Sequence, residues 1–140
     1  MTVTIYHNPE CGTSRNVLAV LEAAGYTPHV VDYLTTGWTR DQLESLFAAA
    51  GLTPRTALRE TKSPAKELGL LDPSVADEAL LEAMLEHPVL VNRPIVVTPK
   101  GTKLCRPSEA VLDLIDRYPP GPFYKEDGEL MIDADGKRVG

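Results

Sequence analysis

The segment from residue 3 to residue 32 constrains the fold most, because it predicts a strand, a loop, a helix and a second strand in direct succession. Residues 3–6 are mostly β-branched or aromatic, and residues 28–32 contain a second β-prone run. Between them, apolar residues recur at the spacing of one helical face, and Gly25 is a natural helix end. These residues are Val17, Val20, Leu21 and Ala24. The pattern predicts a βαβ unit with parallel strands and a right-handed crossover.

A helical segment follows this unit. Thr39 and Gln42 form a capping box at the start of a helix that Gly51 ends. Residues 53–86 predict further helix, with one start at Ser63–Pro64 and a later apolar stripe. The stripe comprises Leu80, Leu81, Met84 and Leu85. We therefore expect a helical insertion in the middle of the chain.

The C-terminal part predicts a hairpin and a last helix. Residues 95–98 and 102–105 are short β-prone runs, and residues 99–101 between them predict a three-residue hairpin loop. Pro107, as the first helical residue, begins the last helix. Prolines and glycines then interrupt regular structure, so for the polar tail 118–140 we expect either a loose strand pair or partial disorder.

The order of these elements predicts an α/β fold. We expect a mixed sheet flanked by helices, in the thioredoxin-like arrangement with a helical insertion. A length of 140 residues is sufficient for one hydrophobic core, so we expect a single domain over residues 1–140.

Composition excludes several classes of protein. With 43% apolar and 24% charged residues, the sequence is typical of a globular protein and not of a disordered one. A net charge of −6 argues against nucleic acid or an anionic membrane surface as the main partner. No stretch approaches the roughly 18 consecutive apolar residues of a membrane span, and the first residues lack a secretory signal. We therefore expect a cytoplasmic protein.

The two cysteines, Cys11 and Cys105, are too few and too far apart for a disulfide scaffold or a four-ligand zinc site, and we expect no bound metal. Cys105 ends a β-prone run, which predicts a place in the core. Cys11 follows a strand and precedes a helix, at the end of the strand where open α/β sheets bind ligands. In this loop, which contains Pro and Gly, we favour a reactive thiol over a buried structural cysteine.

The residues after Cys11 favour its thiolate form, which is the nucleophilic form. The backbone N–H groups of Gly12, Thr13 and Ser14 form an anion nest near a helix N-terminus, and Arg15 adds a positive charge. Gly12 also allows close approach of the backbone to a ligand. An oxyanion bound by these donors would lie against the sulfur.

Ser14 and His7 are the polar neighbours of this cysteine in the sequence. Cys11 and Ser14 have the spacing of a Cys-x-x-Cys redox motif, but a serine cannot close a disulfide. We expect Ser14 to be the helix N-cap and a hydrogen-bond partner of the sulfur. His7 either lowers the pKa of the thiol, by charge or by hydrogen bonding, or is a surface histidine without a role.

Three arginines are candidates for binding an oxyanion, because a guanidinium group offers paired donors to tetrahedral oxyanions. They are Arg59, Arg93 and Arg106. Taken singly, each is more often a solvated surface charge.

Two segments resemble the glutaredoxin-coupled arsenate reductase family. They are Ile5–Asn16 (IYHNPECGTSRN) and Arg93–Ser108 (RPIVVTPKGTKLCRPS), and the resemblance covers nearly the whole chain. Residues 124–128 and 135–138 of the tail are also similar to that family. The resemblance implies a thioredoxin-like fold with a helical insertion, and a cis-proline at Pro94.

The resemblance also implies roles for individual residues. It places the catalytic cysteine at Cys11, and it places the histidine and the serine near the thiol at His7 and Ser14. It implies three oxyanion-binding arginines, at Arg59, Arg93 and Arg106. Arg55 is a less favoured alternative to the first of these.

The implied reaction is reduction of arsenate to arsenite through a covalent thiol–arsenate adduct on Cys11. Because Ser14 cannot resolve that adduct, an external thiol is needed, and in the family this is glutathione followed by glutaredoxin. Glutathione is then a co-substrate, and no cofactor is bound. Two alternatives remain open. One is the related Spx-type regulators, which bind RNA polymerase but typically carry Cys-x-x-Cys; the other is a general glutathione-dependent thiol-disulfide oxidoreductase.

Overall fold

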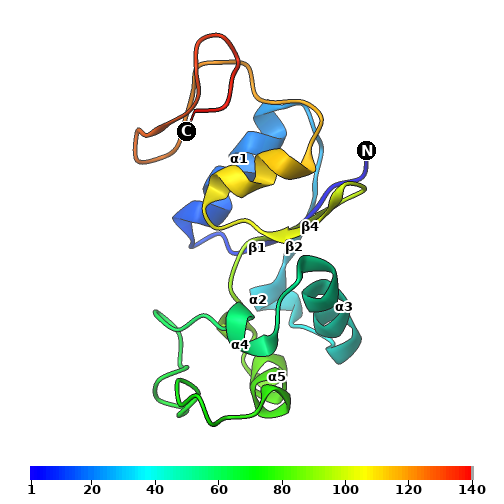
Figure 1. Ribbon diagram of the computed structural model, residues 1–140, viewed down its shortest axis with the longest axis vertical. Coiled ribbons are helices and arrows are strands. Elements are labelled where there is room, and N and C mark those ends of the chain that lie inside the picture. Colours follow the sequence, from blue (N-terminus) through cyan, green and yellow to red (C-terminus); the bar gives the residue numbers. More distant parts are fainter. Residues whose placement is uncertain (140) are drawn as a thin grey trace. The chain divides into compact units, whose positions relative to one another are not determined.

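A four-stranded mixed sheet is built from the early and late parts of the chain (Figure 1). Its strands are β1 (Thr4–His7), β2 (His29–Asp32), β3 (Ile95–Thr98) and β4 (Gly101–Leu104). The strand order is β2-β1-β3-β4, with β1 parallel to β2, and with β3 antiparallel to both β1 and β4. The sheet confirms the predicted pair of parallel strands and the mixed α/β architecture.

The computed structural model describes residues 1–139, and the chain divides into two units. The first comprises Met1–Asp32 and Arg93–Gly140 and contains the sheet. The second comprises Tyr33–Asn92 and is mainly helical. It contains the insertion predicted over residues 53–86, and it also includes the helix predicted from Thr39 to Gly51. Within residues 1–139, none of the helices has both the length and the apolar character that crossing a bilayer requires.

Helix α1 (Gly12–Ala23) has the predicted buried face, but it begins earlier than predicted. We expected Ser14 at the N-cap, whereas the N-cap is Cys11. The reason is that the Ser14 hydroxyl bonds to groups that precede the helix: it accepts the backbone N–H of Asn8 and lies 2.6 Å from Nδ1 of His7. Ser14 therefore connects the helix to β1 instead of capping it.

The core of the first unit lies between the sheet, α1 and the 3-10 helix η2 (Ser108–Leu114), and Figure 1 shows both helices on the same side of the sheet. The helix predicted after Pro107 is therefore present. Pro107 is its N-cap and not its first helical residue, because its backbone is still extended. Other residues of this core include Ile5, Val17, Leu21, Val96 and Leu112.

The hairpin is also present, with a shorter loop than predicted. Gly101 is paired with Thr98 and belongs to β4, so the loop consists of Pro99 and Lys100. Gly101 has φ +147°, a backbone conformation that a glycine adopts more readily than other residues.

The C-terminal tail forms a strand pair that is packed into the first unit. β5 (Phe123–Tyr124) runs antiparallel to β6 (Leu130–Ile132), with an irregular register beside Phe123. Met131 and Ile132 are completely buried and belong to the core cluster. Of the two alternatives expected for the tail, the strand pair is present, and burial of these two side chains packs it against the core.

The second unit contains four α-helices and a short 3-10 helix. They are α2 (Tyr33–Thr36), α3 (Arg40–Ala50), α4 (Pro54–Ala57), α5 (Asp77–Glu86) and η1 (Pro88–Leu90). The capping box at Thr39 and Gln42 and the left-handed Gly51 at the end of α3 are confirmed. The helix start predicted at Ser63–Pro64 is wrong, because residues 61–63 form bends and residues 64–70 form turns. The Ser63 hydroxyl accepts the backbone N–H of Ala65, but no helix continues from it.

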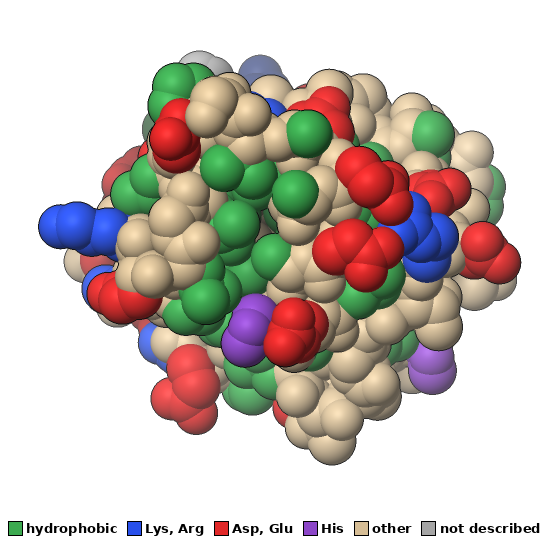
Figure 2. All heavy atoms as spheres, turned by 90° about the horizontal axis from the view of Figure 1, so that it is seen from below, with side chains coloured by type: hydrophobic (Ala, Val, Ile, Leu, Met, Phe, Trp, Pro, Cys, Tyr) green, Lys and Arg blue, Asp and Glu red, His purple; other side chains and the backbone are tan. Residues whose placement is uncertain are grey.

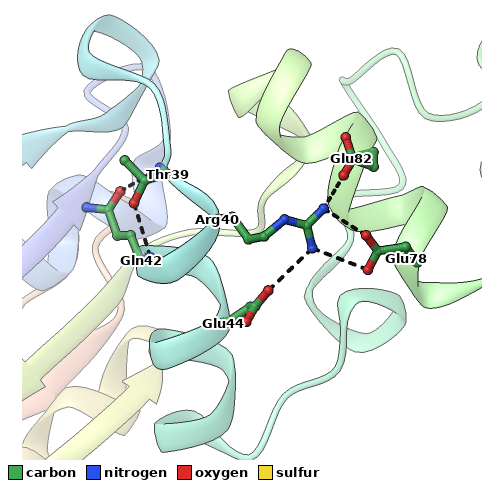
Figure 3. A network of polar contacts seen from close by, with 6 residues as sticks. All are labelled: Thr39, Arg40, Gln42, Glu44, Glu78 and Glu82. Carbon is green, nitrogen blue, oxygen red and sulfur yellow. Dashed lines mark hydrogen bonds and ion pairs between the residues drawn. The ribbon is translucent and has the colours of Figure 1, made fainter.

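Helices α3 and α5 are connected by one arginine. The Arg40 guanidinium contacts the carboxylates of Glu44, Glu78 and Glu82, as Figure 3 shows. A single exposed ion pair contributes little to the stability of the fold, but one guanidinium shared by three carboxylates forms a network, which contributes more. Acidic side chains outnumber basic ones in the sequence, and several of them are visible on the face drawn in Figure 2.

Candidate active site

Cys11 lies at the junction between β1 and α1. Its backbone N–H donates to the carbonyl of Asn8 at 3.0 Å, and its own carbonyl accepts the N–H of Arg15 at 3.0 Å. Cys11 is 7% exposed, so its thiol is largely shielded from solvent while lying at a helix N-terminus. This is the position at which a helix favours a negative charge on sulfur.

Two arginines from the segment that follows the helical insertion lie at this sulfur. Nη1 of Arg106 is 3.7 Å from Sγ of Cys11 and also donates to the carbonyl of Arg93 at 3.3 Å. The Arg93 side chain forms a hydrogen bond with the Cys11 thiol, and it precedes the cis peptide bond to Pro94. The tertiary structure therefore brings together two of the three predicted arginines, and both have the donors that an oxyanion needs.

The surroundings of Cys11 have opposing effects on its ionisation. Burial raises the pKa of the thiol, but several interactions outweigh burial. The backbone N–H of Ser14, the charge and hydrogen bond of Arg93, and the backbone N–H of Thr13 together hold the Cys11 pKa below that of an ordinary cysteine. The thiolate is therefore favoured by groups that could also stabilise a bound oxyanion.

His7 is buried and contacts Ser14. Its Nδ1 lies 2.6 Å from the Ser14 hydroxyl. Burial lowers the His7 pKa below the usual histidine value; the charge of Asp32 opposes this shift and that of Arg15 adds to it. His7 is therefore neutral at neutral pH and carries no positive charge there. Its effect on the Cys11 thiol is thus better explained by its hydrogen bond with Ser14 than by charge.

Arg15 forms an ion pair with Glu126 that the sequence analysis did not predict. Its Nε and Nη2 donate to the two carboxylate oxygens of Glu126 at 2.8 and 3.0 Å, and its Nη1 donates to the carbonyl of Pro9 at 2.8 Å. These hydrogen bonds hold the pKa of Glu126 below its usual value. The charge of Arg15 is thus partly balanced by a carboxylate, and the main cationic influence on the Cys11 thiol comes from Arg93. Sequence reasoning missed Glu126, because it is 111 residues from Arg15.

Gly12 is not required by a close contact within the described residues. A Cβ atom at this position would lie 3.7 Å from Nη2 of Arg15 and 3.9 Å from Oε1 of Glu126, which are ordinary van der Waals distances. We expected close approach of the backbone to a ligand here. That expectation concerns a bound ligand and stays a prediction; in the structure, Gly12 adjoins the Arg15–Glu126 ion pair.

Arg59 belongs to the second unit. Its backbone N–H donates to the carbonyl of Leu90 at 2.8 Å and its Nε donates to the carbonyl of Thr61 at 3.0 Å, and the residue is buried. A part in oxyanion binding stays a prediction for Arg59.

The alternative arginine, Arg55, holds a segment of the second unit in place. Its guanidinium donates to the carbonyls of Leu70, Asp72 and Val75 at 2.6, 2.9 and 3.1 Å. These three acceptors lie in a stretch of turns between α4 and α5. Both terminal nitrogens of Arg55 are therefore used to hold this stretch.

Cys105 is a core residue, as predicted. It is 0% exposed and belongs to the hydrophobic cluster of the first unit. Burial raises the pKa of its thiol to about 12, and the positive charge of Lys103 offsets only part of this effect. Cys105 is therefore protonated and unreactive at neutral pH.

The opposite pKa shifts of the two thiols predict selective alkylation. We expect iodoacetamide to modify Cys11 with a pH midpoint below that of an ordinary cysteine, because the thiolate is the reacting species. Cys105 is expected to react more slowly at every neutral pH. Peptide mass spectrometry after timed alkylation between pH 5 and about 9 measures both rates. A Cys11 midpoint at or above the ordinary value would contradict an activated thiol.

The described part of the chain contains no preformed metal site. Among residues 1–139, no group of three or more His, Cys, Asp or Glu side chains is arranged to hold a metal ion. The groups that the site described above offers for chemistry are a thiol, a helix N-terminus and two arginines.

This fold and site define a thioredoxin-like α/β protein with one activated cysteine at the start of its first helix. A model of the ArsC family matches residues 6–114, which include Cys11, Arg59, Arg93 and Arg106. The chain belongs to the ArsC family.

Several arsenate reductases are similar to this chain, and two of them match it over almost its full length. An arsenate reductase of Synechocystis sp., ArsI2, is 66% identical over 137 residues, covering 98% of each chain. An arsenate reductase of Rhizobium meliloti is 62% identical over 139 residues, covering 99% of each chain. The solved structure of an arsenate reductase from Vibrio cholerae is 43% identical with a TM-score of 0.77, and it covers 82% of this chain and 98% of that chain.

Proposed function

We propose that this protein reduces arsenate to arsenite, with Cys11 as the nucleophile. The observation that carries the proposal is the Cys11 thiol at the N-terminus of α1, with its pKa lowered, hydrogen-bonded to Arg93 and 3.7 Å from Nη1 of Arg106. The similarity to named arsenate reductases at 66% and 62% identity supports the same substrate. A reactive thiol beside anion-binding donors suits attack on an oxyanion.

Binding of arsenate is assigned to groups around the sulfur. The guanidinium groups of Arg93 and Arg106 and the backbone N–H groups of Thr13 and Ser14 supply donors for its oxygens. We propose Arg59 as a third guanidinium, on the basis of the family resemblance. These donors also stabilise the negative charge that develops on the oxygens during attack.

In the first step, the Cys11 thiolate attacks arsenic, an S–As bond forms, and one oxygen leaves as water after taking up protons. In the second step, a glutathione thiolate attacks the Cys11 sulfur, and a disulfide between Cys11 and glutathione forms. The electron pair of the S–As bond passes to arsenic, which changes from As(V) to As(III) and leaves as arsenite. The two sulfur atoms that form the disulfide together lose the two electrons that arsenic gains.

Regeneration of Cys11 requires a second external thiol. Ser14 cannot attack a disulfide, and Cys105 is buried with its pKa raised to about 12. We propose that glutaredoxin takes the glutathionyl group from Cys11, which restores the thiolate. A cytoplasm that keeps glutathione reduced provides these partners, and no bound cofactor is needed.

A coupled assay tests this function. We expect arsenate-dependent oxidation of NADPH when wild-type protein is combined with glutathione, glutathione reductase and glutaredoxin. Omission of glutathione is expected to stop turnover, because Cys11 would remain in its arsenate adduct. Turnover of a small disulfide without turnover of arsenate would contradict the proposal and favour a general thiol-disulfide oxidoreductase.

A further inference from the structure

The Arg15 guanidinium already binds a carboxylate. Its Nε and Nη2 donate to the two oxygens of Glu126 in a bidentate arrangement, at 2.8 and 3.0 Å. The remaining terminal nitrogen donates to the carbonyl of Pro9 at 2.8 Å, which fixes the orientation of the guanidinium plane. Glu126 thus shows which chemical group this fork accepts, since paired donors match the two oxygens of a carboxylate.

This carboxylate position lies one helical turn from the residue that carries the reactive thiol. The backbone N–H of Arg15 donates to the carbonyl of Cys11, so Arg15 follows the cysteine by one helical turn. A Cβ atom on Gly12, the residue next to Cys11, would lie 3.7 Å from Nη2 of Arg15 and 3.9 Å from the carboxylate. The fork and the thiol are thus carried by the first turn of α1 and its N-cap, which places a carboxylate-binding group beside the reactive cysteine.

The Glu126 carboxylate can leave the fork without movement of its own backbone. Both side chains are about half exposed, at 44% and 49%, and exposed ion pairs of this kind are weak. The turn that carries Glu126 is held separately. Its backbone N–H donates to Oδ1 of Asn16 at 2.9 Å, and the neighbouring Lys125 contacts Glu109 and Glu129 at 2.8 and 3.1 Å.

We propose that Arg15 binds a carboxylate of glutathione, in exchange for Glu126. The inference rests on the proposed function, which requires glutathione at the Cys11 sulfur. It divides three arginines of the first unit between two ligands: Arg93 and Arg106 lie at the sulfur for the oxyanion, and Arg15 lies one turn away for the thiol co-substrate. Glu126 occupies the fork when glutathione is absent.

Thiol-disulfide exchange tests this inference in the absence of arsenate. The Cys11 thiolate attacks one sulfur of oxidised glutathione, a mixed disulfide forms, and a glutathione thiolate leaves. Bis(2-hydroxyethyl) disulfide reacts in the same way but has no carboxylate. Mass spectrometry of the intact protein gives both rates. Their ratio cancels any change in the nucleophilicity of Cys11 itself, because the same thiolate attacks both reagents.

The expected results depend on the fork and not on charge alone. In Arg15→Met the ratio of the glutathione rate to the hydroxyethyl rate is expected to fall on the order of threefold to tenfold. Arg15→Lys is expected to show a similar fall, because an ammonium group keeps the charge but lacks paired donors. Glu126→Gln is expected to raise the ratio, because the amide competes less well for Arg15.

Asp127→Asn is the matched control. It removes one negative charge from the same turn, and Asp127 accepts the backbone N–H of Glu129 rather than contacting Arg15. We expect its ratio to equal that of the wild type. Unchanged ratios in both Arg15 variants, a wild-type ratio in Arg15→Lys, or equal increases in Glu126→Gln and Asp127→Asn would each overturn the inference. Failure of arsenate turnover in the coupled assay would overturn the proposed function. The exchange rates would still show whether Arg15 binds a carboxylate of glutathione, because that assay contains no arsenate.

Discussion

Cys11→Ser is expected to abolish arsenate reduction, whereas Cys105→Ser is expected to keep most of it. A serine hydroxyl at position 11 is not ionised by the helix N-terminus and Arg93, so no S–As adduct forms. Cys105 is 0% exposed, and its pKa is raised to about 12, so it supplies no thiolate. Steady-state NADPH oxidation in the coupled assay measures both variants.

The same two variants test an internal relay. In such a relay, Cys105 would form a disulfide with Cys11, and thioredoxin would serve as the reductant. A disulfide needs the two Cα atoms within about 7 Å of each other. Wild-type activity with thioredoxin alone, together with loss of activity in Cys105→Ser, would replace the glutathione mechanism. Retained activity of Cys105→Ser that still requires glutathione would leave Cys11 as the sole catalytic thiol.

Arg106→Ala and Arg93→Ala are each expected to reduce kcat/KM for arsenate on the order of a hundredfold or more. Each substitution removes donors that lie at the Cys11 sulfur and that would hold the oxygens of the transition state. Arg93→Ala is also expected to raise the pKa of Cys11, because Arg93 lowers it by charge and by a hydrogen bond. Initial rates at varied arsenate concentration, combined with the alkylation midpoint, separate these two effects.

Arg117→Ala provides the control for these arginines. Its guanidinium lies 4.6 Å above the ring of Tyr26 and donates to the carbonyl of Gly25, beyond the end of α1 opposite to Cys11. We expect wild-type turnover for it. Since Arg93 is buried and Arg106 is exposed, the urea midpoint of each variant shows whether Arg93→Ala also destabilises the fold. Wild-type turnover in both Arg93→Ala and Arg106→Ala would contradict the oxyanion site.

The elements that sequence reasoning predicted well are those governed by contacts near in the chain. The capping box at Thr39, the stop at Gly51 and the apolar face of α1 depend on residues within one or two turns. The start of α1 was predicted less well. Ser14 is a good N-cap by residue type, but its hydroxyl is taken by His7 and by the backbone of Asn8.

The sequence by itself determined the place of the reactive thiol. A cysteine between a β-prone run and an amphipathic helix must lie at a helix N-terminus, and the local backbone N–H groups then favour its thiolate. It also determined that this thiol has no resolving partner nearby, because Ser14 occupies the fourth position of the motif. These properties follow from neighbours in the chain.

Only the tertiary structure decided which charged groups meet that thiol. Arg106 reaches the Cys11 sulfur across 95 residues, and Glu126 reaches Arg15 across 111 residues. Such contacts depend on strand pairing and on burial of a shared core. The antiparallel β3 and β4 carry the segments of Arg93 and Arg106 to β1, and the buried Met131 and Ile132 fix the tail. Hydrophobic burial is non-directional and long-range in sequence, so no local pattern reveals which side chains it brings together.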